Sequence, residues 1–342
     1  MTLPLRRAGR SGLDLPAISL GLWQNFGEAT ARADRRRVLL HAVERGVVHL
    51  DLANNYGPPP FAAEEFVGDV LRSELRGRRD EIVLTTKAGY HAWPGRYGNG
   101  GSRKYLLASL DRSLRALGTD SVDVFYSHRF DPSTPLTETI GALAHAVRTG
   151  RARYAGISSY SARRTREALA VADDLGLPLT LHQSSYSVFN RWIEEPDDEG
   201  DSVLDVAERR GMGLVAFSPL AQGMLTTKYL DGVPADSRAA TGVSLRPEYL
   251  SEANLTRIRA LHAVARESGT SLPRLALRWV LRDPRVTTVL VGARTVEQLD
   301  DSLAALDDPP VSAAELDAIE AAVDSVEGDP GINLWASRSS DL

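Results

Sequence analysis

Short apolar runs rich in β-branched residues alternate along the chain with longer segments of helical periodicity. Continuously apolar runs are typical of parallel strands buried on both faces, and a single apolar stripe is typical of the helices that cover them. Eight runs are predicted as strands, at residues 17–22, 47–52, 82–86, 122–126, 154–158, 179–182, 214–217 and 288–291. Because eight parallel strands close into a filled barrel, the pattern predicts an α/β protein with a (β/α)8 TIM barrel fold.

Helices are predicted between these strands, at residues 34–44, 63–75, 102–116, 136–149, 161–174, 202–210, 254–268 and 272–281. Ser102, Ser161 and Ser202 stand at three of the predicted helix starts, where a hydroxyl can cap a free backbone N–H. Three longer loops follow strands, at residues 90–101, 190–201 and 229–248. Loops after the strands form the active face of such a barrel, so we expect these loops to cover a site there.

The composition favours one large domain, which we expect to span residues 1–342. The chain is 43% hydrophobic and 25% charged, which is enough to bury a sizeable core. A net charge of -5 gives no general attraction to nucleic acid or to an anionic membrane. The absence of cysteine excludes disulfides and thiolate chemistry. The N-terminus lacks the apolar core of a signal peptide, and no apolar run is long enough to span a bilayer, so we expect a cytoplasmic protein.

Four polar side chains follow the second, third and fourth predicted strands. Asp51 ends the second strand and Tyr56 lies in the loop after it, whereas Lys87 and His128 follow the next two strands. Each residue alone also suits a structural role: Asp51 could cap a helix, Tyr56 could pack in the core, Lys87 could be a solvated charge and His128 a structural imidazole. Their placement on consecutive strands favours a function, because a closed barrel brings the strand ends together around one mouth.

These side chains suit the reduction of a carbonyl group, whose oxygen needs a proton when the carbon receives hydride. A Lys87 ammonium held by Asp51 would lower the pKa of Tyr56 from about 10. Tyr56 could then act as general acid in reduction and as general base in oxidation. His128 could donate a hydrogen bond to the substrate oxygen. A metal-dependent hydrolase is the competing interpretation, but the seven histidines form no H-E-x-x-H or H-x-H pair, so we expect no metal.

The order and spacing of these residues resemble the aldo-keto reductase family over nearly the whole chain. The catalytic Asp, Tyr, Lys and His of the family correspond to Asp51, Tyr56, Lys87 and His128. Several strings are more specifically similar to the branch of bacterial L-glyceraldehyde 3-phosphate reductases, which is itself similar to the β subunits of voltage-gated potassium channels. These strings are SLGLWQNFG, DLANNYGPPP, TKAGYHAWPG, GGSRKYLLASL, YSHR, GISSYS and SPLAQGMLTTKYL.

The resemblance implies NADPH, or NADP+ after turnover, as the cofactor, although the chain has no Rossmann or P-loop motif. In the family a residue pair and a Gln hold the nicotinamide carboxamide, which implies Ser158, Ser159 and Gln183, while Phe217 stacks on the ring. The other implied cofactor residues are Gly21, Trp23, Ser218, Pro219, Leu220, Gln222, Lys228, Gly292, Arg294, Gln298, Asp301 and Ser302.

Three positions depart from the near relatives in this branch. Gly292 and Ala293 are followed by Arg294 and Thr295, where those relatives have Ser and Arg. Ser302 stands where they have Asn, and Gln24 stands where they have His. Arg294 can still meet the 2'-phosphate of NADPH at a helix N-terminus; the alternative is a solvated charge at the start of that helix.

The resemblance also implies a small aldehyde substrate, such as L-glyceraldehyde 3-phosphate or methylglyoxal, and a homo-oligomer of four or eight chains. An NADPH-binding, redox-sensing regulatory subunit with little turnover is the alternative. The candidate substrate residues are Trp23, Tyr56, Trp93, His128 and Arg129, with Trp335 as a further wall and Arg103 and Lys104 as further cations for a phosphate.

Overall fold

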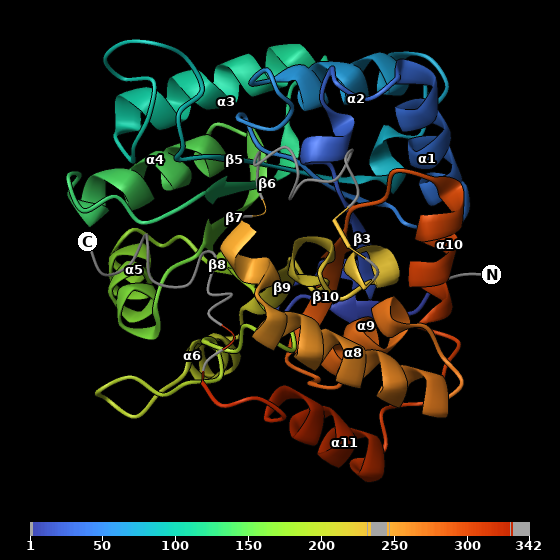
Figure 1. The fold of residues 1–342 in the computed structure, drawn as a ribbon. Coiled ribbons are helices and arrows are strands. Elements are labelled where there is room, and N and C mark those ends of the chain that lie inside the picture. Colours follow the sequence, from blue (N-terminus) through green and yellow to red (C-terminus); the bar gives the residue numbers. More distant parts are fainter. Residues whose placement is uncertain (1–2, 231, 234–244, 246, 329, 331–342) are drawn as a thin grey trace.

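The computed structural model describes residues 3–230, 232–233, 245, 247–328 and 330 of the chain. Eight parallel strands close into a single barrel in the order β10-β3-β4-β5-β6-β7-β8-β9, with helices packed around them (Figure 1). The predicted (β/α)8 fold is therefore confirmed. The prediction that one domain spans residues 1–342 extends beyond the described residues and stays a prediction.

Each of the eight predicted strands overlaps one strand of the barrel. The strands are β3 (Ile18–Gly21), β4 (His49–Asp51), β5 (Val83–Ala88), β6 (Val122–Ser127), β7 (Ala152–Ser158), β8 (Leu179–Ser185), β9 (Gly213–Phe217) and β10 (Val286–Val291). Their side chains point alternately into the barrel and toward the helices, so neighbouring residues of one strand have different surroundings.

The helices carry the caps that the sequence predicted. Ser102, Ser161 and Ser202 each accept a hydrogen bond from the backbone N–H three residues later. The helices are α1 (Arg32–Glu44), α2 (Ala62–Arg72), α3 (Arg103–Leu117), α4 (Leu136–Arg148), α5 (Ala162–Asp174), α6 (Val203–Arg210), α8 (Glu252–Glu267), α9 (Leu272–Leu281), α10 (Val296–Ala304) and α11 (Ala313–Val323). Of α10 only the start near Arg294 was expected, and α11 was not predicted. Helix α11 packs beside α8 outside the ring of helices (Figure 1).

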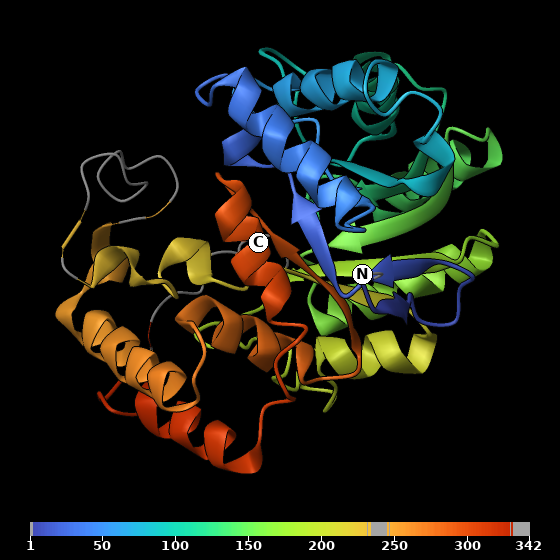
Figure 2. The ribbon, with the colours of Figure 1, turned by 90° about the vertical axis from the view of Figure 1, so that its right-hand side faces the viewer.

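A short antiparallel hairpin of β1 (Leu5–Arg7) and β2 (Asp14–Pro16) precedes the barrel. Figure 2 shows these dark blue strands lying against the barrel. Ala8 and Leu15 join a buried cluster whose other members come from the barrel interior. The hairpin thus closes the barrel end that lies opposite the C-terminal ends of the strands. No helix in the described part of the chain is both long and apolar enough to cross a membrane.

Candidate active site

The C-terminal ends of β4, β5 and β6 bring together the four predicted catalytic side chains, those of Asp51, Tyr56, Lys87 and His128. Lys87 Nζ donates hydrogen bonds to Asp51 Oδ2 at 2.6 Å, to the Leu52 carbonyl at 2.7 Å and to Tyr56 Oη at 3.3 Å. The backbone N–H of His128 donates to the Ala88 carbonyl at 2.9 Å, which fixes the start of the loop after β6. One ammonium group therefore connects the acid to the phenol.

The Asp51 carboxylate is held on both oxygens. Its Oδ1 accepts hydrogen bonds from Thr85 Oγ1 and from Gln183 Nε2, each at 2.9 Å, while Oδ2 accepts from Lys87. Asp51 and Lys87 are only 1% and 0% exposed. A buried ion pair is stable only when its remaining hydrogen-bonding positions are also filled, and here the neighbouring strands fill those of the carboxylate.

Backbone hydrogen bonds hold the loop that carries Tyr56. The N–H of Tyr56 donates to the Ala53 carbonyl at 2.9 Å, and the N–H of Phe61 donates to the Asn54 carbonyl at 2.8 Å. The fully buried Asn54 side chain donates to Tyr105 Oη at 2.8 Å, so the loop is also anchored to α3. Tyr56 is consequently held in an anchored loop between β4 and α2.

The pKa of Tyr56 differs from the prediction. Burial, the Asp51 charge and the neighbouring Tyr90 together raise the pKa of Tyr56 well above its ordinary value, whereas the sequence predicted that Lys87 would lower it. The physical reason is that burial removes the water that would stabilise a phenolate. Burial also lowers the pKa of Lys87, against the opposing effect of Asp51, and lowers the pKa of His128 well below its usual value. Tyr56 is therefore a phenol and His128 a neutral imidazole at neutral pH.

A pocket of about 100 Å³ opens beside this group. The His128 ring lies edge-on to Tyr56 and Tyr90, with ring centroids 5.8 Å and 4.7 Å apart. His128 Nδ1 is buried without a hydrogen-bond partner among the described residues. The lining residues are Trp23, Asn55, Tyr56, Tyr90, His128, Ser158, Ser159, Gln183, Phe217 and Ser218. Asn55 and Tyr90 were not predicted; their only signal in the sequence is their closeness to Tyr56 and Lys87.

The residues on the β7 to β9 side of this pocket fit a nicotinamide nucleotide. Ser158, Ser159, Gln183 and Phe217 line the same pocket, so the residues expected to hold the carboxamide and to stack on the ring lie together there. Farther along, the buried Gln222 has a positive φ of 60°, and neither atom of its amide has a partner among the described residues. A strained, buried amide with unused hydrogen-bonding capacity is a feature of ligand-binding loops.

Strained backbone continues along the same rim. Ser159, Ser218 and Ala221 also adopt positive φ values, of 57°, 55° and 45°. Pro219 and Leu220 lie between them, and Lys228 is exposed in the short helix Thr227–Tyr229 that follows. These segments lie at the C-terminal ends of β7 and β9, where the cofactor residues were predicted.

The residues predicted for the adenosine end lie around α10. Thr295 caps this helix by accepting a hydrogen bond from the Gln298 N–H, and Gln298 Oε1 in turn accepts from the Arg294 N–H at 2.9 Å. The nearby Gly292 is exposed. Asp301 accepts a hydrogen bond from Ser271 Oγ, and Ser302 donates to the Gln298 carbonyl at 2.9 Å. Asp301 and Ser302 thus bond to neighbouring protein groups, and Gly292, Arg294 and Gln298 lie at the exposed start of the helix.

The predicted substrate residues separate into two groups. Trp23, Tyr56 and His128 line the pocket, and Gly21 ends β3 next to Trp23. Trp93 lies outside the lining, because its ring stacks on Phe61 and packs against Tyr105, with centroids 6.4 Å and 4.9 Å away. The structure thus places Trp93 outside the lining of this pocket, and its role as a substrate wall stays a prediction.

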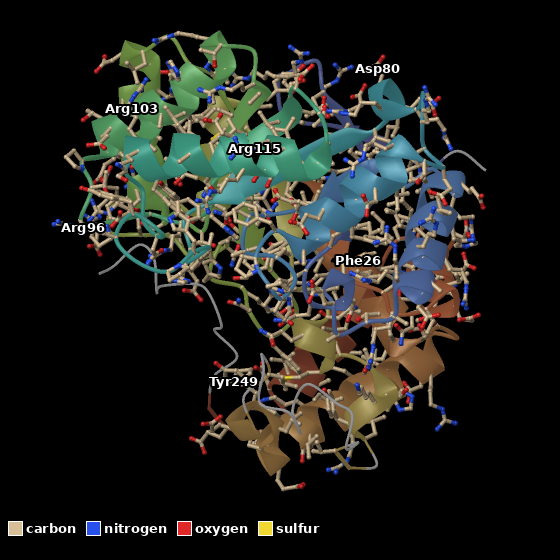
Figure 3. The ribbon with its side chains drawn as sticks, turned by 90° about the horizontal axis from the view of Figure 1, so that it is seen from above. Phe26, Asp80, Arg96, Arg103, Arg115 and Tyr249 are labelled. Carbon is tan, nitrogen blue, oxygen red and sulfur yellow. The ribbon has the colours of Figure 1, made fainter. Side chains whose placement is uncertain are left out.

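The three cations predicted for a substrate phosphate lie at different distances from the pocket. The Arg129 guanidinium lies 5.0 Å from the centroid of Tyr90, a lining residue. Arg103 donates to the Gly141 carbonyl at 3.1 Å and lies at the outer surface of α3 (Figure 3), and Lys104 lies over the exposed Tyr97 ring. Arg129 is thus the cation beside the pocket. The predicted Trp335 lies outside the described residues.

Comparisons with known proteins agree with this geometry. The model of the Aldo/keto reductase family matches residues 17–324. The L-glyceraldehyde 3-phosphate reductases of Escherichia coli O157:H7 and of Escherichia coli strain K12 are each 49% identical over 338 residues, covering 98% of this chain and 95% of the relative. A probable voltage-gated potassium channel subunit beta of Oryza sativa subsp. japonica is 36% identical over 328 residues, covering 94% of this chain and 96% of the relative.

Proposed function

This chain belongs to the aldo/keto reductase family, and we propose that it reduces a small aldehyde with NADPH, with Tyr56 supplying the proton. The family and the named reductase relatives make the chain an oxidoreductase. The observation that carries the finer proposal is the position of the buried Lys87 ammonium, which bonds Asp51 and lies 3.3 Å from Tyr56 Oη. Tyr56 in turn lines a pocket together with His128.

Our proposal assigns the cofactor to the β7 to β10 side of the mouth. Ser158, Ser159 and Gln183 would hold the nicotinamide, with Phe217 against its ring. Ser218, Gln222 and Lys228 would follow the pyrophosphate, and Arg294 would meet the 2'-phosphate at the start of α10, where the positive end of the helix dipole favours an anion. When bound, NADPH supplies the hydride.

Tyr56 would supply the proton of the reaction, and Lys87 would stabilise the phenolate that is left. The raised pKa of Tyr56 keeps its proton in place until the substrate oxygen becomes an alkoxide, which is a stronger base than a phenolate. The proton then passes from Tyr56 Oη to that oxygen. Lys87 stabilises the phenolate that remains, and Asp51 holds Lys87 in position.

His128 would orient the substrate. Its lowered pKa leaves a neutral imidazole, which carries a single N–H donor. Donating this hydrogen to the substrate oxygen stabilises the negative charge as it develops and places the oxygen beside Tyr56. The aromatic rings of Trp23 and Tyr90 shield the pocket from water.

For the substrate we propose L-glyceraldehyde 3-phosphate or a small aldehyde such as methylglyoxal. The support for a phosphorylated aldehyde is that the two Escherichia coli relatives are L-glyceraldehyde 3-phosphate reductases. Arg129 is the cation proposed for the phosphate. Its Nε donates to the Gly89 carbonyl and its Nη2 to Asn99 Oδ1, each at 3.0 Å, which holds the guanidinium next to Tyr90.

A panel of aldehydes assayed by NADPH oxidation tests this function, and it should include both enantiomers of glyceraldehyde 3-phosphate. Tyr56→Phe should lower kcat about a thousandfold, the range of general acid catalysis, while NADPH still quenches tryptophan fluorescence. Tyr160→Phe is the matched control, because this buried phenol bonds Ser127 outside the pocket. Steady-state activity retained by Tyr56→Phe would contradict the assigned role.

An NADPH-binding regulatory subunit is the second candidate, favoured by the plant relatives named as probable potassium channel β subunits. This second candidate predicts that the wild type binds NADPH tightly but reduces no aldehyde of the panel faster than the Tyr56→Phe variant does. The homo-oligomeric assembly and cytoplasmic location expected from the sequence stay predictions.

A further inference from the structure

A row of hydroxyl groups and one imidazole crosses the inside of the barrel and ends at Asp51. Thr288 Oγ1 lies 2.7 Å from Ser19 Oγ, which lies 2.9 Å from His49 Nδ1. His49 Nε2 lies 3.4 Å from Thr85 Oγ1, and Thr85 donates to Asp51 Oδ1 at 2.9 Å. These groups come from β10, β3, β4 and β5, and none is more than 1% exposed.

The last hydrogen bond determines the direction of the others. Thr85 has one hydroxyl proton and donates it to Asp51, so its oxygen can only accept from His49. His49 must then carry its proton on Nε2 and accept from Ser19 at Nδ1. Ser19 gives its own proton to His49 Nδ1 and accepts one from Thr288. The Pro16 carbonyl, which could also accept the Ser19 proton, lies farther away at 3.4 Å.

This arrangement requires a neutral imidazole. Burial lowers the pKa of His49 to about 4, with Lys87 acting in the same direction and Asp51 against it. His49 is therefore neutral at pH 7, and every donor in the row points toward the Asp51 carboxylate. Hydrogen bonds that follow one another in one direction polarise and strengthen each other in a low-dielectric interior.

We propose that His49 is a positioning residue for the reduction assigned above: through Thr85 it fixes the orientation of the Asp51 carboxylate, and so of the Lys87 ammonium beside Tyr56. The role rests on the proposed function. Without the Thr85 hydrogen bond, Oδ1 of Asp51 keeps the Gln183 amide as its one hydrogen-bond partner among the described residues, and the carboxylate can turn away from Lys87.

The chain contains a matched control in His182. This residue of β8 is also fully buried, and burial lowers its pKa to about 4 as well. Its Nδ1 lies 2.9 Å from Ser184 Oγ, and its Nε2 lies 3.1 Å from both Thr165 Oγ1 and the Tyr160 carbonyl. These contacts lead to α5 and away from Asp51, so a substitution here reproduces the loss of a buried imidazole without breaking the row.

Steady-state kinetics with an aldehyde that the wild type reduces is the first test. His49→Met and Thr85→Val should each lower kcat about tenfold, the effect of one hydrogen bond to a charged group, with KM within about twofold of wild type. His49→Gln and Thr85→Ser, which keep a donor in place, should restore most of the activity. His182→Met should keep kcat within about twofold at a similar loss of Tm. A His49→Met enzyme no slower than His182→Met would overturn the role.

The second test needs no turnover or cofactor. In protein labelled with 15N-histidine, the His49 imidazole, identified by its absence from His49→Met, should be neutral at pH 7 with its proton on Nε2. A proton on Nδ1, or a charged ring, would overturn the proposed direction of the row. If the wild type reduces no aldehyde, the proposed function fails, and the role of His49 in reduction fails with it. If the wild type is active but the kinetics of His49→Met or the protonation of His49 contradicts the expectation, only the role of His49 fails.

Discussion

The inside of the barrel has two unlike halves. In the polar half, β10, β3, β4 and β5 contribute Thr288, Ser19, His49, Asp51, Thr85 and Lys87. In the apolar half, β6, β8, β9 and the end of β10 contribute Val124, Tyr126, Leu181, Val215 and Leu290, and the hairpin adds Ala8 and Leu15. Both halves are buried, so burial alone does not separate them.

The two halves are held together by different forces. Burial of apolar side chains away from water lowers the free energy of the folded state. Gly156 makes room for the Tyr126 ring, because a Cβ at that position would lie only 2.4 Å from it. The Asp51–Lys87 pair instead costs free energy to bury, and hydrogen bonds from neighbouring strands offset that cost. The comparison therefore predicts that the apolar half supplies stability, whereas the polar half mainly sets the chemistry.

The largest effect should follow from Lys87→Met. It removes the charge that stabilises the Tyr56 phenolate, so kcat for aldehyde reduction should fall about a thousandfold. It also leaves the buried Asp51 carboxylate without its partner, which should lower the free energy of unfolding by about 3–5 kcal/mol. Kinetics and urea unfolding measure the two losses.

The double variant Asp51→Asn with Lys87→Met separates these losses. A neutral pair removes the unpaired charge, so the double variant should regain most of the stability and none of the activity. Recovery of activity together with stability would show that the polar half acts through folding alone and would remove the distinction between the halves.

In the apolar half the effects should be reversed. Leu181→Ala leaves a cavity in a site that is 0% exposed and should cost about 2–5 kcal/mol of stability, with kcat within about threefold of wild type. Leu5→Ala is the matched control, because Leu5 is 60% exposed and its truncation should cost at most about 0.5 kcal/mol. If the kcat of Leu181→Ala fell as far as that of Lys87→Met, stability and chemistry would not be divided between the two halves.

The sequence predicted the strand ends of the polar half but not its interior. Asp51 and Lys87 were identified because each ends an apolar run, and chain topology places such ends at one mouth. Ser19, His49 and Thr85 lie within the runs, where a single polar residue reveals neither its direction nor its partner. The hydrogen-bonded row is therefore visible only in the folded structure.

Other differences have equally local causes. Strands β1 and β2 have three residues each, too few for a periodicity, so the hairpin was not predicted. The pKa of Tyr56 depends on how completely the phenol is buried, which chain order does not specify. Trp93 lies in a loop without periodicity, and its packing on Phe61 depends on contacts between distant segments.

A smaller effect concerns the outer face of β5, behind the polar half. Thr86 donates to Glu64 Oε1 at 2.5 Å, and Glu64 is fully buried, so burial raises its pKa to about 7. Between pH 4.5 and 7 the folded protein holds a proton that the unfolded chain has lost. Stability from this group is therefore complete below the unfolded pKa and is lost as the pH rises through 7.

Glu64→Gln tests this sign, because a carboxamide mimics the protonated carboxyl. The variant and the wild type should be equally stable near pH 4.5, and the variant should be more stable by about 3 kcal/mol near pH 8. Urea unfolding across this pH range measures the difference. A variant less stable than wild type at the higher pH would mean that Glu64 is held as a carboxylate and supports the polar half by its charge.

The smallest effect is expected at the boundary between the halves, at Tyr126. Its ring belongs to the apolar cluster. Its hydroxyl lies near the Gln183 amide but forms no hydrogen bond with any described residue. Tyr126→Phe should therefore change the free energy of unfolding by less than about 0.5 kcal/mol and kcat by less than about twofold. Because Gln183 donates to Asp51, a clear loss of kcat would show that the hydroxyl joins the polar network through Gln183. The boundary would then pass through the Tyr126 side chain itself, between its ring and its oxygen.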